Sequence, residues 1–199
     1  MKRKLECRWA LWCGVWMVIT LLAACDRLTK PTSSGRPYEV LVVVDDQLWQ
    51  RPAGRALLDT DVPGLPQPER SFRISQTTQK RFSQVLNIFR TIIKVDIDPT
   101  QYTQTKMKFT RDVYARPQVV LTIQSPNEKD FAAFVKKNSR SIIDFLVKVE
   151  MNRQINELEE KHSEAVSQLA EEIFKCQLWA PAEIKSYKKG KDFFWASSN

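Results

Sequence analysis

The sequence predicts a mixed α+β fold, in which an antiparallel meander and a buried N-terminal strand are packed on one face by helices. Residues 38–44 are a valine-rich, nearly continuous apolar run, which is typical of a buried central strand. Residues 93–98 and 106–113 alternate apolar and polar side chains, which indicates strands with one wet face. Apolar side chains at helical spacing between residues 131 and 173 predict the covering helices.

Short elements precede the meander. The first strand ends at Asp45 and Asp46, and Asp46 is placed to cap a short helix that continues after Pro52. A stiff loop with three prolines between residues 63 and 68 follows, then a short strand at 72–74 and helical spacing at 82–89. The meander is expected to contain three consecutive antiparallel strands, with turns at Asp98-Pro99 and Arg116-Pro117 and the third strand at 119–123.

A long helical region follows the meander. Ser125, Pro126 and Glu128 stand at N-cap, N1 and N3, which is a capping box with a favourable first residue. Apolar stripes at 131–149 and 155–173 fall on nearly opposite sides of one continuous helix at about 100° per residue. The helix therefore breaks near residues 150–153, or a straight helix needs a second partner; we expect a break. The tail predicts a hairpin of residues 184–187 and 192–195.

The first 24 residues have the three parts of a secretory signal peptide. Four basic residues within positions 2–8 precede an apolar run at 9–22, and two alanines follow. The run is shorter than the roughly 20 residues of a membrane-spanning helix. An ordinary signal peptide and a retained transmembrane anchor are the alternatives to the lipoprotein signal described next.

Residues 22–25, Leu-Ala-Ala-Cys, resemble the lipobox of bacterial lipoproteins. In that class the cysteine thiol receives a diacylglyceryl group, a signal peptidase cuts before it, and the new amine is acylated, for example with palmitate. The resemblance implies that Cys25 is the lipid-attachment site and residue one of the mature chain. Two or more acyl chains hold a protein firmly at a membrane, whereas one holds it marginally.

The mature chain is expected to consist of a tether and one domain. Residues 25–37 are rich in Ser, Thr, Pro and Gly, which predicts a flexible tether. Residues 38–199 predict a single α+β domain. A lipidated Cys25 would place this domain in the cell envelope, with the outer membrane favoured. The periplasmic side is favoured over surface display because no acidic run follows the cysteine.

Charge and cysteine content limit the classes of function. The chain carries a net charge of +8, of which the signal peptide contributes about three, so the mature chain is mildly basic. This charge is too small to indicate nucleic-acid binding. Cys7 and Cys13 leave with the signal peptide and Cys25 carries lipid, so Cys176 has no partner within the mature chain and is expected to be a buried, inert thiol.

Carboxylates are the remaining candidates for chemistry. His162 is the chain's single histidine and lies on an apolar stripe, so it is interpreted as a half-buried packing residue and no relay or histidine metal site can be built. Asp45 and Asp46 follow a buried strand, where α/β sites often lie, although a helix cap is the favoured interpretation. No cofactor is expected, because no phosphate-binding loop pattern is present.

Asp96 and Asp98 share one strand face and have the oxygen ligands that a hard cation prefers. Three lysines at 94, 106 and 108 belong to the same face, so cross-strand charge pairing is the favoured interpretation. A lysine-rich hairpin at 185–191 and tryptophans 49, 179 and 195 have the chemistry to bind anionic or neutral glycans, but a solvated hairpin and core packing are favoured for them.

Four segments carry a resemblance to a known family: GRPYEVLVVVDDQLW (35–49), DTDVPGLPQPERSFRIS (59–75), VDID (95–98) and ARPQVVLTIQSP (115–126). Together they resemble an uncharacterised lipoprotein family of Bacteroidetes, domain-of-unknown-function family 4837. The resemblance supports the lipoprotein prediction and brings no activity. Family members usually continue past a motif like KGKDFFW (189–195), which implies that this chain is a truncated member.

The leading hypothesis is a non-enzymatic envelope lipoprotein that is held in a membrane by Cys25 and binds an envelope protein or glycan, or assists envelope assembly. The alternative is an envelope hydrolase or metal-assisted enzyme that uses Asp45, Asp46, Asp96 and Asp98. Convergence of these four carboxylates in one cleft would favour the enzyme, whereas scattered and lysine-paired carboxylates would favour the binding protein.

Overall fold

The structure is a computed structural model that describes residues 30–59, 61–62 and 64–198. The expected signal peptide at 1–24 and the lipid-attachment residue Cys25 lie outside the described residues. The chain divides into two compact units, which are described separately. Unit 1 comprises Met1–Leu57 and Phe72–Lys136, and unit 2 comprises Leu58–Ser71 and Lys137–Asn199. The single domain expected over 38–199 stays a prediction.

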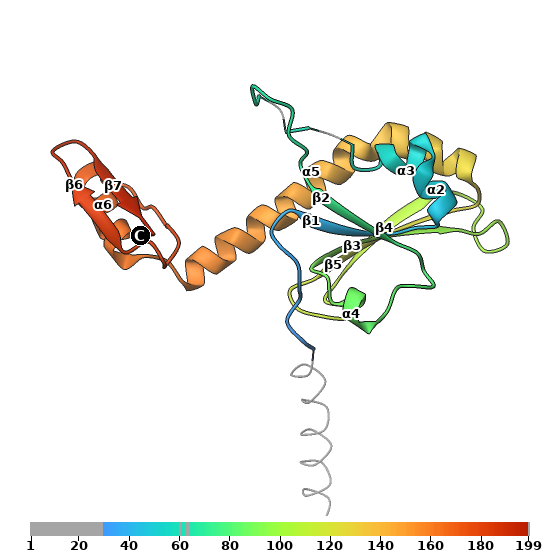
Figure 1. The fold of residues 1–199 in the computed structure, drawn as a ribbon, viewed down its shortest axis with the longest axis horizontal. Coiled ribbons are helices and arrows are strands. Elements are labelled where there is room, and N and C mark those ends of the chain that lie inside the picture. The colour runs from blue at the N-terminus through green and yellow to red at the C-terminus, as the bar shows by residue number, and fades with distance from the viewer. Residues whose placement is uncertain (1–29, 60, 63, 199) are drawn as a thin grey trace, which may run out of the picture. The chain divides into compact units, whose positions relative to one another are not determined.

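Unit 1 is built on a five-stranded, mostly parallel sheet in the order β2-β1-β3-β5-β4 (Figure 1). The strands are β1 Glu39–Val43, β2 Arg73–Thr77, β3 Thr91–Ile97, β4 Lys106–Arg111 and β5 Val119–Ser125. β1 pairs with β2 and β3 in parallel, and β3 pairs with β5 in parallel. β4 is antiparallel to β5 and forms one edge of the sheet.

The mixed α+β class is confirmed, but the antiparallel meander is wrong. β3 and β5 are direct parallel neighbours, with Ile93 opposite Leu121, and β4 lies outside them. The physical reason is the distribution of apolar residues: Ile92, Ile93 and Leu121 are buried, whereas every residue of β4 is exposed. The apolar strands therefore occupy the centre, and the lysine-bearing strand occupies the edge, where charged side chains are tolerated.

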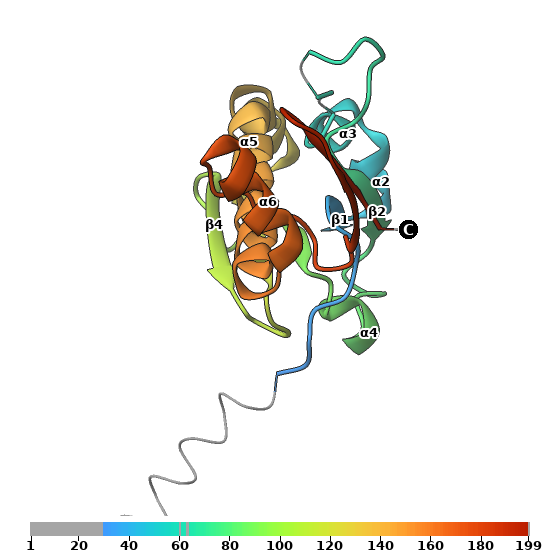
Figure 2. The ribbon, with the colours of Figure 1, turned by 90° about the vertical axis from the view of Figure 1, so that its left-hand side faces the viewer.

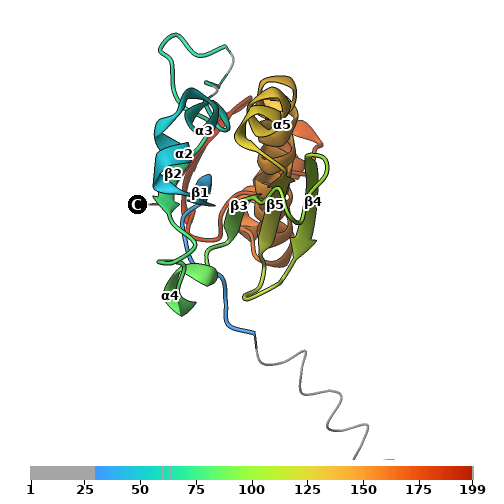
Figure 3. The ribbon, with the colours of Figure 1, turned by 90° about the vertical axis from the view of Figure 1, so that its right-hand side faces the viewer.

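Both faces of this sheet are covered. Figures 1 and 3 show α2 Asp46–Gln50, α3 Pro52–Ala56 and the first turns of α5 on one side, and α4 Gln84–Asn87 on the other. On one face Leu41, Val43, Ile92 and Val120 form a core against partly buried residues that include Phe82 and Phe89. Their alternating neighbours on the other face, Val40, Val42, Ile93 and Leu121, are also buried. Burial of both faces explains the valine run.

Part of the expected flexible tether is attached to unit 1. Thr32 and Ser34 form isolated parallel bridges with Arg116 and Phe89. The backbone N–H of Ser33 donates to Arg116 O and that of Ser34 to Ile88 O, both at 2.8 Å. Within the expected tether, residues 31–34 thus have backbone hydrogen-bond partners in unit 1, and the flexibility expected over 25–37 stays a prediction.

The long helix α5 Glu128–Glu160 runs without interruption through residues 150–153, so the break expected there is wrong. The chain leaves the helix after Glu160, and α6 begins at Glu164. At the start of α5 the capping residue is Asn127, whose Oδ1 accepts from the backbone N–H of Asp130 at 2.9 Å. The expected cap, Ser125, is the last residue of β5 instead.

The C-terminal part of unit 2 contains α6 Glu164–Phe174 and a hairpin of β6 Ser186–Lys189 and β7 Phe194–Ser197 (Figure 2). The hairpin is confirmed, but its turn lies two residues later than expected. Gly190 N–H donates to Phe193 O at 2.8 Å, and a Cβ at this glycine would meet the Phe193 ring. Over the described residues, none of the helices combines the length and apolarity needed to cross a membrane.

Candidate functional site

The four candidate carboxylates lie along the edge of the sheet where the parallel strands end. β1 ends at Val43, just before Asp45 and Asp46. β3 contains Asp96 and is followed by Asp98. Because β1 and β3 are parallel neighbours, their carboxyl ends meet the same edge, which is where ligand sites of α/β sheets are usually found. We call this end of the sheet, where the parallel strands finish, the carboxyl edge of unit 1; it is distinct from the lateral edges formed by β2 and β4.

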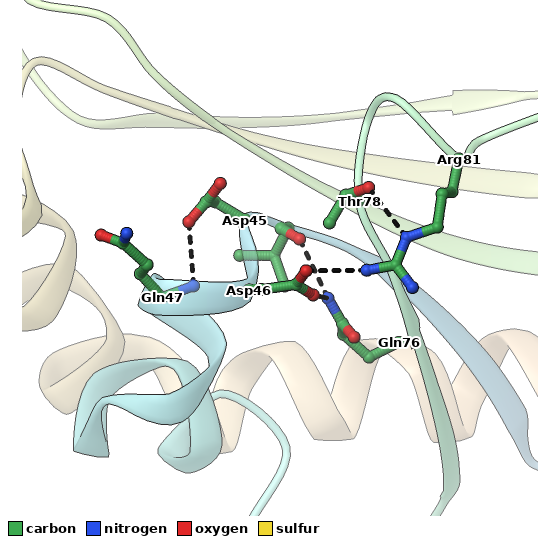
Figure 4. A network of polar contacts seen from close by, with 7 residues as sticks. Asp45, Asp46, Gln47, Gln76, Thr78 and Arg81 are labelled. Carbon is green, nitrogen blue, oxygen red and sulfur yellow. Dashed lines mark hydrogen bonds and ion pairs between the residues drawn. The ribbon is translucent and has the colours of Figure 1, made fainter.

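Asp45 and Asp46 point to different partners (Figure 4). Asp45 is the N-cap of α2, and its Oδ1 accepts from the backbone N–H of Gln47 at 2.9 Å. Asp46 accepts from Arg81 Nη2 at 2.7 Å and from Gln76 Nε2 at 3.0 Å. The cap expected at Asp46 is therefore made by Asp45, one residue earlier. Asp46 instead ties α2 to the end of β2 and the loop that follows it.

The contacts of Asp46 are solvated. More than half of the Asp46 and Arg81 side chains is accessible to water, and an ion pair of that kind contributes at most about 1 kcal/mol to stability. Gln76 also donates to Val44 O at 3.1 Å, and Arg81 Nε donates to Thr78 Oγ1 at 3.4 Å. These contacts join the ends of β1 and β2, so the network is suited to holding the edge together.

Asp96 and Asp98 lie further along the same edge and are also separately engaged. Tyr102 donates its hydroxyl to Asp96 Oδ2 at 2.6 Å, and Gln124 Nε2 donates to the Tyr102 oxygen at 2.8 Å. Asp98 Oδ1 accepts from the hydroxyl and the backbone N–H of Thr100 at 2.6 and 2.8 Å, and Oδ2 accepts from Gln101 at 2.8 Å.

These contacts shift two pKa values. The hydroxyl of Thr100, followed by its backbone N–H, lowers the pKa of Asp98 because both donate to the ionised carboxylate. The hydrogen bond to Asp96 is the largest cause of a raised pKa at Tyr102, because a phenolate cannot donate it. Asp98 therefore remains ionised at neutral pH and Tyr102 remains protonated.

The expected lysine pairing of Asp96 and Asp98 is wrong. Within the described ranges, no lysine ammonium forms an ion pair with either carboxylate, and Lys94 Nζ instead lies 5.3 Å from the centroid of the Phe82 ring. The partners that sequence reasoning missed are Gln76, Arg81, Thr100 and Tyr102. The sequence Asp98-Pro99-Thr100 carries a signal for one of them, because Asp in a turn commonly accepts from the residue two positions on.

No three His, Cys, Asp or Glu residues in the described part of the chain are grouped so that they could hold a metal ion. The four carboxylates share an edge, but each has its own partner: a helix N-terminus, an arginine and glutamine, a tyrosine, and a threonine turn. Each of the four carboxylates is therefore held by a hydrogen bond to its own partner.

Unit 2 contains the single histidine, the exposed cysteine and two of the tryptophans considered as candidate site residues. His162 is half-buried, its Nδ1 lies 2.9 Å from Leu158 O, and its ring stacks on Trp179 at 5.7 Å between centroids. Cys176 is exposed, so the expected buried thiol is wrong. Lys175 ends α6 in the left-handed conformation (φ 55°), and this places Cys176 in the irregular segment beyond the helix. Trp179 and Trp195 are also exposed rather than packed in a core.

An open groove of about 580 Å³ lies beside α6. It is lined by polar residues of α6, by the segment that follows the helix, and by the indole of Trp179. The α6 side contributes Ser167, Glu171 and Lys175. An aromatic ring among hydrogen-bonding groups can stack on a sugar ring while the polar groups bind its hydroxyls.

The chain belongs to a family described as Domain of unknown function (DUF8532), whose model matches residues 33–159. This confirms the prediction of an uncharacterised family, but the assignment to family 4837 is wrong. The matched residues include the whole carboxyl edge and end near the end of α5, so α6 and the hairpin lie beyond them. No curated protein and no solved structure matches the chain.

Proposed function

We propose that this chain is a lipid-anchored protein of the cell envelope, held in a membrane through Cys25, with a binding or envelope-assembly role that involves no catalysis. The observation that carries the proposal is the order of the N-terminal signals. A basic start, an apolar run at 9–22 and Leu-Ala-Ala-Cys at 22–25 occur in the sequence that export and lipidation require. The outer membrane and its periplasmic side are the proposed location, and Bacteroidetes the proposed lineage.

Two structural observations support the proposal. The first backbone contact of the described chain is made by Pro31, six residues after Cys25, so pairing with unit 1 begins close in sequence to the proposed anchor. The four candidate catalytic carboxylates each have a separate structural partner, which supports a binding role over hydrolysis.

Intact mass and membrane fractionation test the anchor. The wild-type chain is expected to yield a mass that begins at an acylated Cys25 and to sediment with membranes, whereas Cys25→Ser should lose both the lipid and the membrane association. Cys176→Ser is the matched control, because that cysteine is exposed and lies beyond the signal. A wild-type chain without lipid in the soluble fraction would reject the anchor.

A hydrolase assay tests the absence of catalysis. Purified protein should show no hydrolytic activity that depends on Asp46 or Asp96. A rate that survives purification and disappears in Asp46→Asn or Asp96→Asn, with the fold retained, would replace the binding proposal with the enzyme.

The groove beside α6 is the proposed ligand site, and glycans of the envelope are the proposed ligand class. Amino-sugar oligosaccharides should quench or shift tryptophan fluorescence, and Trp179→Ala should abolish the response. Trp195→Ala is the control because Trp195 is exposed but does not line the groove. An equal response in both variants would place sugar binding elsewhere, and no response in the wild type would remove glycans as the ligand class.

A further inference from the structure

The two ends of the parallel strands in unit 1 differ in charge. Where the parallel strands begin, six basic residues gather, and all but the half-buried Arg90 are exposed. We call this the basic edge, and its members are Lys30, Arg36, Arg73, Arg90, Arg111 and Arg116. Two acidic residues, Glu39 and Asp112, share that edge. The basic edge therefore carries an excess of four positive charges.

The carboxyl edge has no such excess. Its acidic residues are Asp45, Asp46, Asp96, Asp98, Glu128 and Asp130. Its basic residues are Arg51, Arg55, Lys80, Arg81, Lys106 and Lys129. Several of these charges neutralise one another directly, as in the ion pairs of Arg51 with Glu128 and of Arg81 with Asp46. The positive charge of unit 1 is thus concentrated at one end of the strands.

The chain reaches unit 1 at this basic edge. Lys30 Nζ donates to Asp112 O at 2.7 Å, and Arg116 N donates to Pro31 O at 2.9 Å. These contacts fix the first described residues beside Arg111 and Arg116. Five residue steps separate Lys30 from Cys25, and fully extended chain covers at most about 3.6 Å per step, so the link spans no more than about 18 Å.

We infer that the basic edge is a docking surface for the anionic phospholipid headgroups of the membrane that holds Cys25. The inference rests on the proposed lipid anchor and adds which face of unit 1 meets the membrane. Attraction to an anionic surface decays over a screening length of about 8–10 Å at physiological salt, so a link of at most about 18 Å keeps the edge close to that range. Arginines suit this partner because their guanidinium groups bind phosphate in a bidentate manner.

Hydrogen–deuterium exchange of the lipidated full chain in vesicles tests the inference. One set of vesicles contains phosphatidylcholine alone, and the other contains added phosphatidylglycerol. The backbone amides of residues 30–37 and 111–118 should exchange about fivefold more slowly in the vesicles that contain phosphatidylglycerol than in those without it. This factor corresponds to roughly one charge contact at an anionic surface. The difference should disappear in 1 M sodium chloride, where the screening length falls to about 3 Å.

Charge reversals locate the surface. Arg36→Glu combined with Arg111→Glu should abolish the protection, since both side chains are exposed on the basic edge. Lys80→Glu with Lys129→Glu makes the same change in net charge on the carboxyl edge and should leave the protection intact. If the first pair disturbs the circular dichroism spectrum, Arg36→Gln with Arg111→Gln repeats the test with a milder change and should lower the protection.

The outcomes separate the two proposals. Equal exchange in both kinds of vesicle, or equal loss in both charge-reversal pairs, overturns the docking surface. If the intact mass of the same preparation still shows an acylated Cys25, the lipid anchor stands and only the docking surface is rejected. An unlipidated Cys25 overturns the anchor and the docking surface together.

Discussion

A buried ion pair lies in the middle of α5, where a break was expected. Arg153 Nη1 donates to Glu150 Oε2 at 2.9 Å, and the exposed fractions of the two side chains are 9% and 2%. The break was expected because the apolar stripes at 131–149 and 155–173 fall on nearly opposite sides of one continuous helix. The ion pair lies between the two stripes, and pairing across one turn offsets the cost of burying both charges there.

Removing one partner of this pair should destabilise the fold strongly. Arg153→Met leaves a carboxylate that is buried without its arginine, and the free energy of unfolding should fall by about 3–5 kcal/mol. Denaturant unfolding followed by circular dichroism measures the loss. The double variant Glu150→Leu with Arg153→Met is the control, and it should recover most of the stability because apolar side chains then replace both buried charges. If the double variant is as unstable as the single one, the packing of the side chains matters more than their charge.

The Thr100 turn should set the ionisation of Asp98. Its lowered pKa means that folding favours the carboxylate, so this contribution is complete above the usual value of 3.8 and is lost as pH falls through the folded pKa. Thr100→Ala removes the hydroxyl that is the largest cause and should raise the pKa towards 3.8. Carbon-13 NMR titration of the Asp98 carboxyl group measures this pKa. Thr103→Ala, in the same loop, should leave the pKa unchanged; an equal shift there would exclude the specific hydrogen bond.

At the scale of elements, local patterns predicted the strands, the long helical region and the hairpin, but not the continuity of α5 or how the strands pair. The alternation in residues 106–111 identifies β4 as a strand and carries no information on its neighbour. The partner of β3 is decided by burial over the whole sheet, which makes β5 a better central neighbour than β4. The observed helix caps, Asp45 and Asn127, lie one or two residues away from the predicted caps, because several side chains compete for the same helix N-terminus.

The entry segment should contribute to stability as a pairing element. Ser34→Pro removes the N–H that donates to Ile88 O, and the free energy of unfolding should fall by about 1–3 kcal/mol. Thermal or denaturant unfolding measures the change. Ser34→Ala keeps the backbone donor and should be nearly neutral. Equal stability of Ser34→Pro and the wild type would show that residues 31–34 do not depend on this pairing in solution.

At the scale of the whole molecule, sequence reasoning identified the four carboxylates and predicted that one of them would cap a helix. It did not predict that all four lie on one edge, because that follows from the parallel pairing of β1 with β3. The partners Arg81 and Tyr102 come from loops, whose positions depend on the same topology. The charge excess of the basic edge was equally hidden, since its six residues are distributed from position 30 to 116.

The C-terminal segment should unfold before the sheet of unit 1. From Glu164 onward the described chain buries the apolar residues Val166, Leu169 and Ala170, while β6 is exposed throughout and no residue of β7 is fully buried. Central strands β1, β3 and β5 bury apolar residues on both faces, and apolar burial is the main source of stability. Segments that bury less apolar surface unfold locally at a lower cost in free energy.

Tryptophan fluorescence can separate the two transitions in a chain prepared to begin at Cys25, which contains Trp49, Trp179 and Trp195. Trp49→Phe leaves reporters in the C-terminal segment, and Trp179→Phe with Trp195→Phe leaves the reporter in unit 1. The first variant should show a lower denaturant midpoint than the second, because its reporters lie where little apolar surface is buried. Circular dichroism of the wild type should then show both steps. Coincident midpoints for all three measurements would mean that the chain unfolds as one cooperative unit, as the single domain expected over 38–199 requires.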